Sequence, residues 1–66
     1  MELSQNEKLE AMAILQDCID NGRIESFSDG DLNPSSVQAE VSFEATERGH
    51  DDAMAEAMGD YAAENC

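Results

Sequence analysis

The sequence predicts a small α+β domain, in which two helices pack on one face of an antiparallel hairpin of two strands. Two amphipathic helical patterns near the ends of the chain, and one strictly alternating pattern between them, indicate this class. A chain of 66 residues has room for only one domain. We therefore expect residues 1–66 to form a single acidic α+β domain with the element order α-β-β-α.

The first helix is predicted over residues 5–21. Ser4 and Glu7 have the spacing of a capping box, in which two side chains bind free backbone N–H groups where a helix begins. Asn21 and Gly22 are typical of a helix end. Apolar residues at helical spacing between these signals indicate one buried face. The residues expected on that face are Leu9, Met12, Leu15 and Ile19, with Cys18 beside them.

The hairpin is predicted from the segment VQAEVSFEA, residues 37–45, in which apolar and polar residues alternate. Such alternation is typical of a strand that buries one face. Residues 23–27 are the expected partner strand, because a turn-rich segment that ends in Asn33-Pro34 separates the two. The open edges of a two-stranded sheet would also allow a homodimer.

The second helix is predicted over residues 51–64, after a break in the alternating pattern. Its apolar residues recur at i, i+3, i+4, i+7 and i+8, which is the spacing of an amphipathic helix. These residues are Met54, Ala57, Met58, Tyr61 and Ala62.

Charge is the outlying feature of the composition. Sixteen Asp and Glu residues oppose three Lys and Arg residues, and the formal net charge is -13. Such a charge disfavours direct binding to DNA, RNA or anionic lipid. No apolar run approaches the roughly 20 residues of a membrane span, and no secretory leader is visible. We expect a cytoplasmic protein without a membrane partner, in the cytoplasm of the host cell if the protein is viral.

Four acidic residues of the second predicted helix recur every fourth position and form a column down one face. Each like-charge pair at this spacing costs about 0.2–0.5 kcal/mol, so three pairs cost about 1 kcal/mol. The core of so small a domain rarely supplies more than about 3–5 kcal/mol, so helix stability does not explain these acids. The column consists of Asp52, Glu56, Asp60 and Glu64.

Further acidic residues extend the expected anionic surface. Glu40 and Glu44 would point to solvent from the outer face of the strand at residues 37–45. Glu10, Asp17 and Asp20 form a second candidate patch on the first helix. Together with the column, these residues are the candidate partner-binding site.

The column suggests mimicry of nucleic acid. Its spacing of about 6 Å is similar to the separation of neighbouring phosphates along one strand. We therefore expect a non-enzymatic inhibitor that blocks the basic DNA- or RNA-binding channel of another protein. In size and charge alone, the chain resembles the small acidic proteins that bacterial viruses make against host nucleases, restriction systems and CRISPR complexes. This resemblance implies an anti-CRISPR or anti-restriction type of activity, although no motif identifies a target.

Two other classes remain open. The chain is also compatible with a small structural or partner-binding domain of a salt-adapted organism, or with an acidic subunit that neutralises a basic partner. An enzyme is not expected, because no nucleophile–base pair, metal set or phosphate loop is visible. No cofactor or metal is expected either. Asp29, Asp31, Asn33 and Glu40 have calcium-loop spacing, but Pro34 stands where that loop needs glycine.

Overall fold

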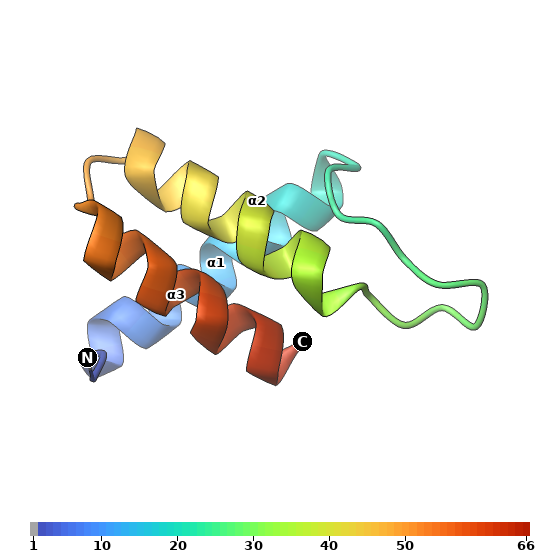
Figure 1. The fold of residues 1–66 in the computed structure, drawn as a ribbon, viewed down its shortest axis with the longest axis horizontal. Coiled ribbons are helices and arrows are strands. Elements are labelled where there is room, and N and C mark those ends of the chain that lie inside the picture. Colours follow the sequence, from blue (N-terminus) through green and yellow to red (C-terminus); the bar gives the residue numbers. More distant parts are fainter. Residues whose placement is uncertain (1) are drawn as a thin grey trace.

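Three α-helices make up the fold in the computed structural model, which describes residues 2–66 (Figure 1). Helix α1 spans Gln5–Asp20, α2 spans Pro34–Glu47 and α3 spans Asp52–Asn65. Helices α2 and α3 lie side by side, and α1 crosses behind them. The connection of residues 21–33 extends beyond one end of the bundle. The domain is therefore all-α, with no β-strand in the part of the chain that the structure describes.

The prediction of an α+β class with a hairpin is wrong, because residues 37–45 lie within α2. An alternating series contains the positions i, i+4 and i+8, which a helix also brings to one face. Val37, Val41 and Ala45 occupy those positions and are fully buried. Phe43, which a strand would have buried beside them, is instead 58% exposed.

The start of α2 is fixed by the dipeptide that suggested a turn. Asn33 is the N-cap, and its side-chain oxygen accepts a hydrogen bond of 3.0 Å from the backbone N–H of Ser35. Pro34 follows at the first helical position, where its missing N–H and fixed φ angle suit a helix. Helix α2 ends just before Gly49, whose φ angle of 101° lies in the left-handed region that glycine adopts readily. These local signals outweigh the alternating pattern.

The other predicted strand, residues 23–27, lies in the connection between α1 and α2. This segment makes one isolated antiparallel bridge, between Ser26 and Leu32. The backbone N–H of Asn33 also donates to the carbonyl of Glu25 at 2.9 Å. The connection thus folds back on itself without forming a sheet.

Both predicted terminal helices are confirmed to within one residue at each end. The capping box of α1 is present: the N–H of Glu7 donates to Ser4 Oγ at 3.2 Å, and the N–H of Ser4 donates to Glu7 Oε1 at 2.7 Å. At the start of α3, Asp51 is the N-cap and accepts from the N–H of Met54 at 2.8 Å. Each helix therefore begins at a side chain that satisfies a free backbone donor.

The core lies where the three helices meet, and α1 is rotated from its expected orientation. Leu9 is 60% exposed and Ile19 is also exposed, whereas Ala11 and Ile14 are fully buried. Leu15 and Cys18 are in the core as expected. Burial raises the pKa of the Cys18 thiol above its ordinary value. The core consists of Ala11, Ile14, Leu15, Cys18, Val37, Val41, Ala45, Ala55, Met58 and Ala62.

Helices α2 and α3 pack closely at Gly59, in the middle of α3. A Cβ atom placed on Gly59 would lie 2.6 Å from the backbone oxygen of Gln38 and would overlap the hydroxyl of Ser42. No ordinary side chain fits at this position without a shift of one helix. The packing of α2 on α3 therefore depends on the absence of a side chain at residue 59.

Candidate partner-binding surface

Eight of the nine candidate acids fall into two groups in the structure. The four residues of the acidic column lie on the exposed side of α3. Four others lie along the line where α1, α2 and the start of the connection meet, which we call the α1–α2 seam. The acidic residues of the seam are Glu10, Asp17, Glu40 and Glu44. The structure therefore does not join all the predicted site residues into one surface.

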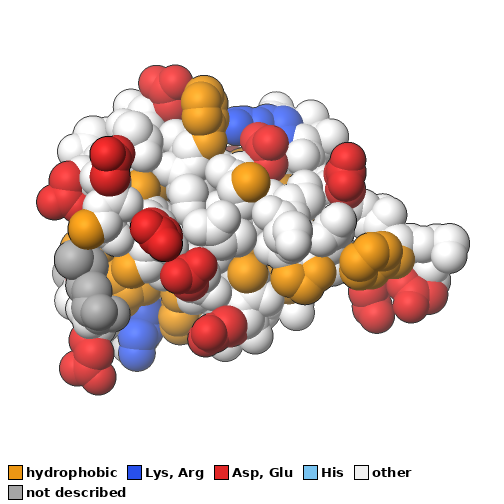
Figure 2. Space-filling view, viewed as in Figure 1, with side chains coloured by type: hydrophobic (Ala, Val, Ile, Leu, Met, Phe, Trp, Pro, Cys, Tyr) orange, Lys and Arg blue, Asp and Glu red, His pale blue; other side chains and the backbone are white. Residues whose placement is uncertain are grey.

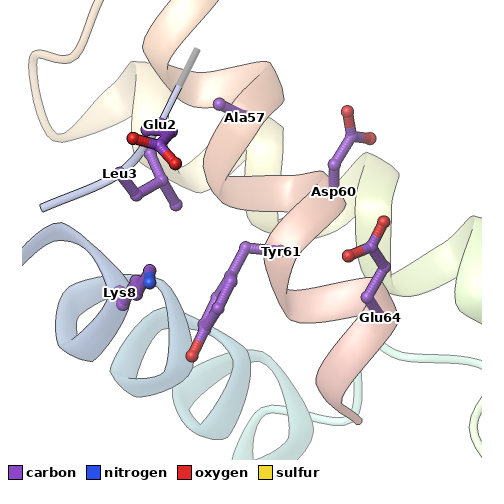
Figure 3. A pocket seen from close by; sticks show the side chains of 7 residues that line it. All are labelled: Glu2, Leu3, Lys8, Ala57, Asp60, Tyr61 and Glu64. Atoms are coloured by element: carbon purple, nitrogen blue, oxygen red, sulfur yellow. The ribbon is translucent and has the colours of Figure 1, made fainter. Parts of the chain in front are cut away.

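The acidic column winds around α3 instead of running straight along it. Four residues advance a helix by about 400°, so each step turns the column by about 40°. Asp52 and Glu56 consequently lie beside α2, where they line a groove between the two helices. Asp60 and Glu64 lie toward the start of the chain, in a depression that Lys8 and Tyr61 also line (Figure 3). The column thus borders two hollows of the surface.

No basic side chain pairs with the column among residues 2–66, since each ion pair found there involves other acids. Lys8 lines the same depression as Asp60 and Glu64, and its ammonium group lies 5.9 Å from the centre of the Tyr61 ring. Tyr61 projects from α3 toward α1, away from Asp60 and Glu64 (Figure 3). The four carboxylates of the column therefore face solvent without internal neutralisation.

Arg23 neutralises the two acids of α2 that were expected to face solvent from a strand. Its Nη2 atom lies 2.8 Å from Glu40 Oε1, and its Nη1 atom lies 3.4 Å from Glu44 Oε2. Hydrogen bonding to Glu40 raises the pKa of Arg23 further above its ordinary value. Glu40 and Glu44 are half-buried. The two glutamates that were predicted to face solvent from a strand are thus residues of α2 that form ion pairs with Arg23.

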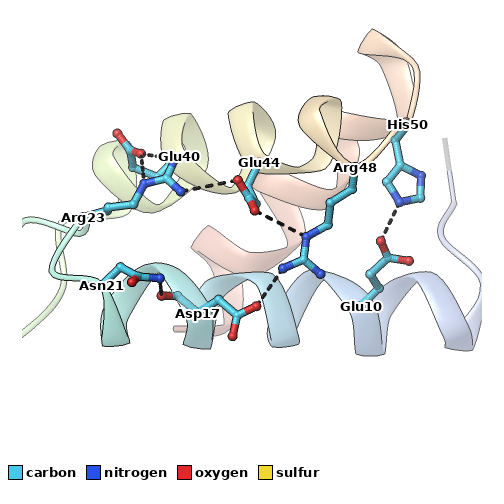
Figure 4. A network of polar contacts seen from close by, with 8 residues as sticks. All are labelled: Glu10, Asp17, Asn21, Arg23, Glu40, Glu44, Arg48 and His50. Carbon is cyan, nitrogen blue, oxygen red and sulfur yellow. Dashed lines mark hydrogen bonds and ion pairs between the residues drawn. The ribbon is translucent and has the colours of Figure 1, made fainter.

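Arg48 continues the seam from the other end of α2. Its Nη2 atom lies 2.7 Å from Asp17 Oδ2, and its Nε atom lies 3.6 Å from Glu44 Oε1. Acids and arginines therefore alternate along the seam, with Glu44 between Arg23 and Arg48 (Figure 4). Hydrogen bonding to Asp17 raises the pKa of Arg48. Two of the three Lys and Arg residues of the chain are used in this way.

The remaining candidate acids also have partners within the domain. Glu10 Oε2 lies 2.6 Å from Nε2 of His50, which connects α1 to the segment before α3 (Figure 4). Asp20 accepts a hydrogen bond of 2.9 Å from the side-chain amide of Gln16, one turn earlier in α1. Glu10 is thus part of the contacts between separate segments, whereas Asp20 stays exposed and its contact lies within α1.

The groove between α2 and α3 is a feature that the sequence did not reveal. It is shallow, and its lining includes Ala39 and Phe43 from α2, Asp52 and Glu56 from α3, and the buried Ala55. Phe43 was expected in the core of a hairpin, and only its place on a helix puts it on the surface. The signal that could have located it is the helix start at Asn33-Pro34.

We predict that Arg48→Met lowers the free energy of unfolding by about 0.5–1 kcal/mol, because partly exposed ion pairs contribute about 0.2–1 kcal/mol each. Thermal melts followed by circular dichroism at low salt measure this change. Lys8→Met is the matched control, since it removes the same charge from a residue without a carboxylate partner in the described chain. Equal losses in both variants would show that net charge, and not the seam, determines the effect.

Comparisons with protein-family models, curated proteins and solved structures find no match in any of the three. Within residues 2–66, no helix is long and apolar enough to cross a membrane. The same residues contain no cluster of three or more His, Cys, Asp or Glu side chains placed to hold a metal ion. The fold and the surface thus define a small three-helix domain with an exposed acidic column.

Proposed function

We propose that this domain is a non-enzymatic inhibitor that binds the basic nucleic-acid channel of another protein and competes with DNA or RNA for it. One observation carries the proposal: the acidic column stays exposed and unpaired along α3, while Arg23 and Arg48 pair with Asp17, Glu40 and Glu44 of the α1–α2 seam and Glu10 contacts His50. Arg48 links α2 to α1, and Arg23 links the connection to α2. The negative charge of α3 is left available for a partner.

The dimensions of the column support this function. From Asp52 to Glu64 the helix rises by about 18 Å, in three steps of about 6 Å. Such spacing is similar to that of a few successive phosphates on one strand. A positively charged cleft attracts a surface of this kind over a distance set by the ionic strength. Association with such a cleft is therefore fast, and the affinity falls as salt rises.

The class of target follows from charge complementarity. Proteins that bind nucleic acid without reading sequence present rows of Lys and Arg to phosphates, and these rows fit a column of carboxylates. The size and net charge of this domain are similar to those of small viral proteins directed against restriction systems and CRISPR complexes. We therefore propose a target of that kind in the host cytoplasm, with the α3 column, and not the seam, as the contact surface.

A displacement experiment tests the proposal. The protein is immobilised, incubated with lysate of its host at about 0.05 M salt, where screening is weak, and washed with duplex DNA or with RNA. We expect nucleic acid to release the captured partner. The variant Glu56→Gln with Asp60→Asn should capture much less, whereas the control Glu25→Gln with Glu47→Gln should capture as much as the unmodified chain. A partner that nucleic acid does not release, or that both variants capture equally, would contradict the proposal.

A further inference from the structure

The α2–α3 groove combines apolar surface with unpaired negative charge. Ala39 and Phe43 line it from α2, while Asp52 and Glu56, the first half of the acidic column, line it from α3. The face formed by α2 and α3 shows apolar and acidic side chains interspersed (Figure 2). A single exposed apolar residue is ordinary on a protein surface. The placement of Phe43 beside two free carboxylates distinguishes this groove.

One face of the Phe43 ring lies near the seam. The guanidinium of Arg23 lies 5.8 Å from the ring centre, and Arg23 is itself fixed by Glu40 and Glu44. Phe43 is 58% exposed, so most of its ring is available for an apolar contact with a partner.

We propose that the α2–α3 groove binds a protein segment that presents one apolar side chain between lysines or arginines. The apolar side chain packs on Ala39 and Phe43, and the flanking cations pair with Asp52 and Glu56. This inference rests on the proposed function and specifies the partner contact. A surface that only mimics a phosphate backbone needs no apolar contact. The apolar contact in the groove therefore lets the domain distinguish between basic surfaces that the acidic column attracts equally.

Two synthetic peptides of equal length and charge test the groove directly. Both are rich in lysine; one has leucine at its centre and the other has serine. Binding is measured by calorimetric titration at about 0.15 M salt, where charges beyond about 8 Å are largely screened. We expect the leucine peptide to bind the unmodified protein at least tenfold more tightly than the serine peptide.

Two phenylalanine variants provide the matched comparison. Phe43→Ala should remove the tenfold preference and leave the weaker, charge-dependent binding of both peptides. Phe27→Ala should keep the preference, because Phe27 is also exposed, at 51%, but lies on the connection and does not line the groove. Circular dichroism should show an intact fold in both variants, since neither side chain is in the core.

The outcomes separate this inference from the proposed function. Equal binding of the two peptides, or an equal effect of both phenylalanine variants, would overturn the proposal for the groove. The acidic column would then remain as the proposed contact surface. Failure of both peptides to bind, or binding that Glu56→Lys does not weaken, overturns both proposals. If the protein sediments as a dimer that Phe43→Ala converts to a monomer, a second copy covers the groove and the proposed partner is wrong.

Discussion

Replacing Gly59 with alanine is expected to lower the free energy of unfolding by about 1–3 kcal/mol, which is the usual effect of extra volume at a tightly packed site. The new Cβ would lie 2.6 Å from the carbonyl oxygen of Gln38 and overlap the hydroxyl of Ser42. The Gln38 carbonyl belongs to the backbone of α2, so it cannot rotate away from the new Cβ as the end of a flexible side chain can. Because a small core rarely supplies more than about 3–5 kcal/mol, this change removes a large share of the stability.

The sign of the Gly59→Ala effect identifies its cause. In the interior of an isolated helix, alanine is more favourable than glycine by about 0.5–1 kcal/mol. Urea denaturation followed by circular dichroism gives the free energy of each variant. Ala13→Gly, at an exposed position in the middle of α1, is the control and should lose about 0.5–1 kcal/mol through helix propensity alone.

A second variant tests the contact itself. Ser42→Gly combined with Gly59→Ala removes the overlapping hydroxyl and leaves the contact with Gln38, so it should be destabilised by less than the two single changes together. If Gly59→Ala instead melted at a higher temperature than the unmodified protein, α2 and α3 would not approach each other as the structure shows.

The terminal helices were predictable because their signals are local. Ser4 with Glu7 specifies the start of α1, and both side chains make the expected hydrogen bonds. The acidic column was predictable for the same reason, since its spacing depends only on α3 being a helix. Nothing beyond neighbouring residues was needed for either inference.

The middle of the chain was mispredicted because its pattern is ambiguous at short range. Val37, Val41 and Ala45 share one face of a strand and one face of a helix, so their burial does not distinguish the two. Phe43 decides between them, and only its exposure in the folded domain reveals the answer. The local signals that favoured a helix were the cap at Asn33, Pro34 directly after it, and Gly49 at the other end.

The α1–α2 seam was unpredictable for a different reason. Arg23 is 17 residues from Glu40, and Arg48 is 31 residues from Asp17, so only the tertiary fold brings these charges together. A count of charges treats Glu40 and Asp17 as equivalent to Glu56. The structure separates them, because the first two are paired within the domain and Glu56 is free in the described chain.

Glu56→Lys is expected to stabilise the domain while weakening its binding at least tenfold. Glu56 has an acid four residues away on each side, Asp52 and Asp60, and a lysine between them turns two repulsions into attractions. The gain should be about 1 kcal/mol at low salt, which raises the melting temperature of a domain of this size by about 4–8 °C. The same lysine would repel the basic partner that the proposed function requires.

Opposite changes in stability and binding would be the signature of a surface kept for a partner. Thermal melts and titration with the serine-centred lysine peptide measure the two quantities on the same samples. Glu25→Lys is the matched control, since it changes the net charge equally from an exposed position in the connection, away from the column. Equal weakening by the control would show that overall charge, and not the column, attracts the partner. A gain in stability that persists in about 1 M salt, where the screening length falls to about 3 Å, would contradict an origin in repulsion along α3.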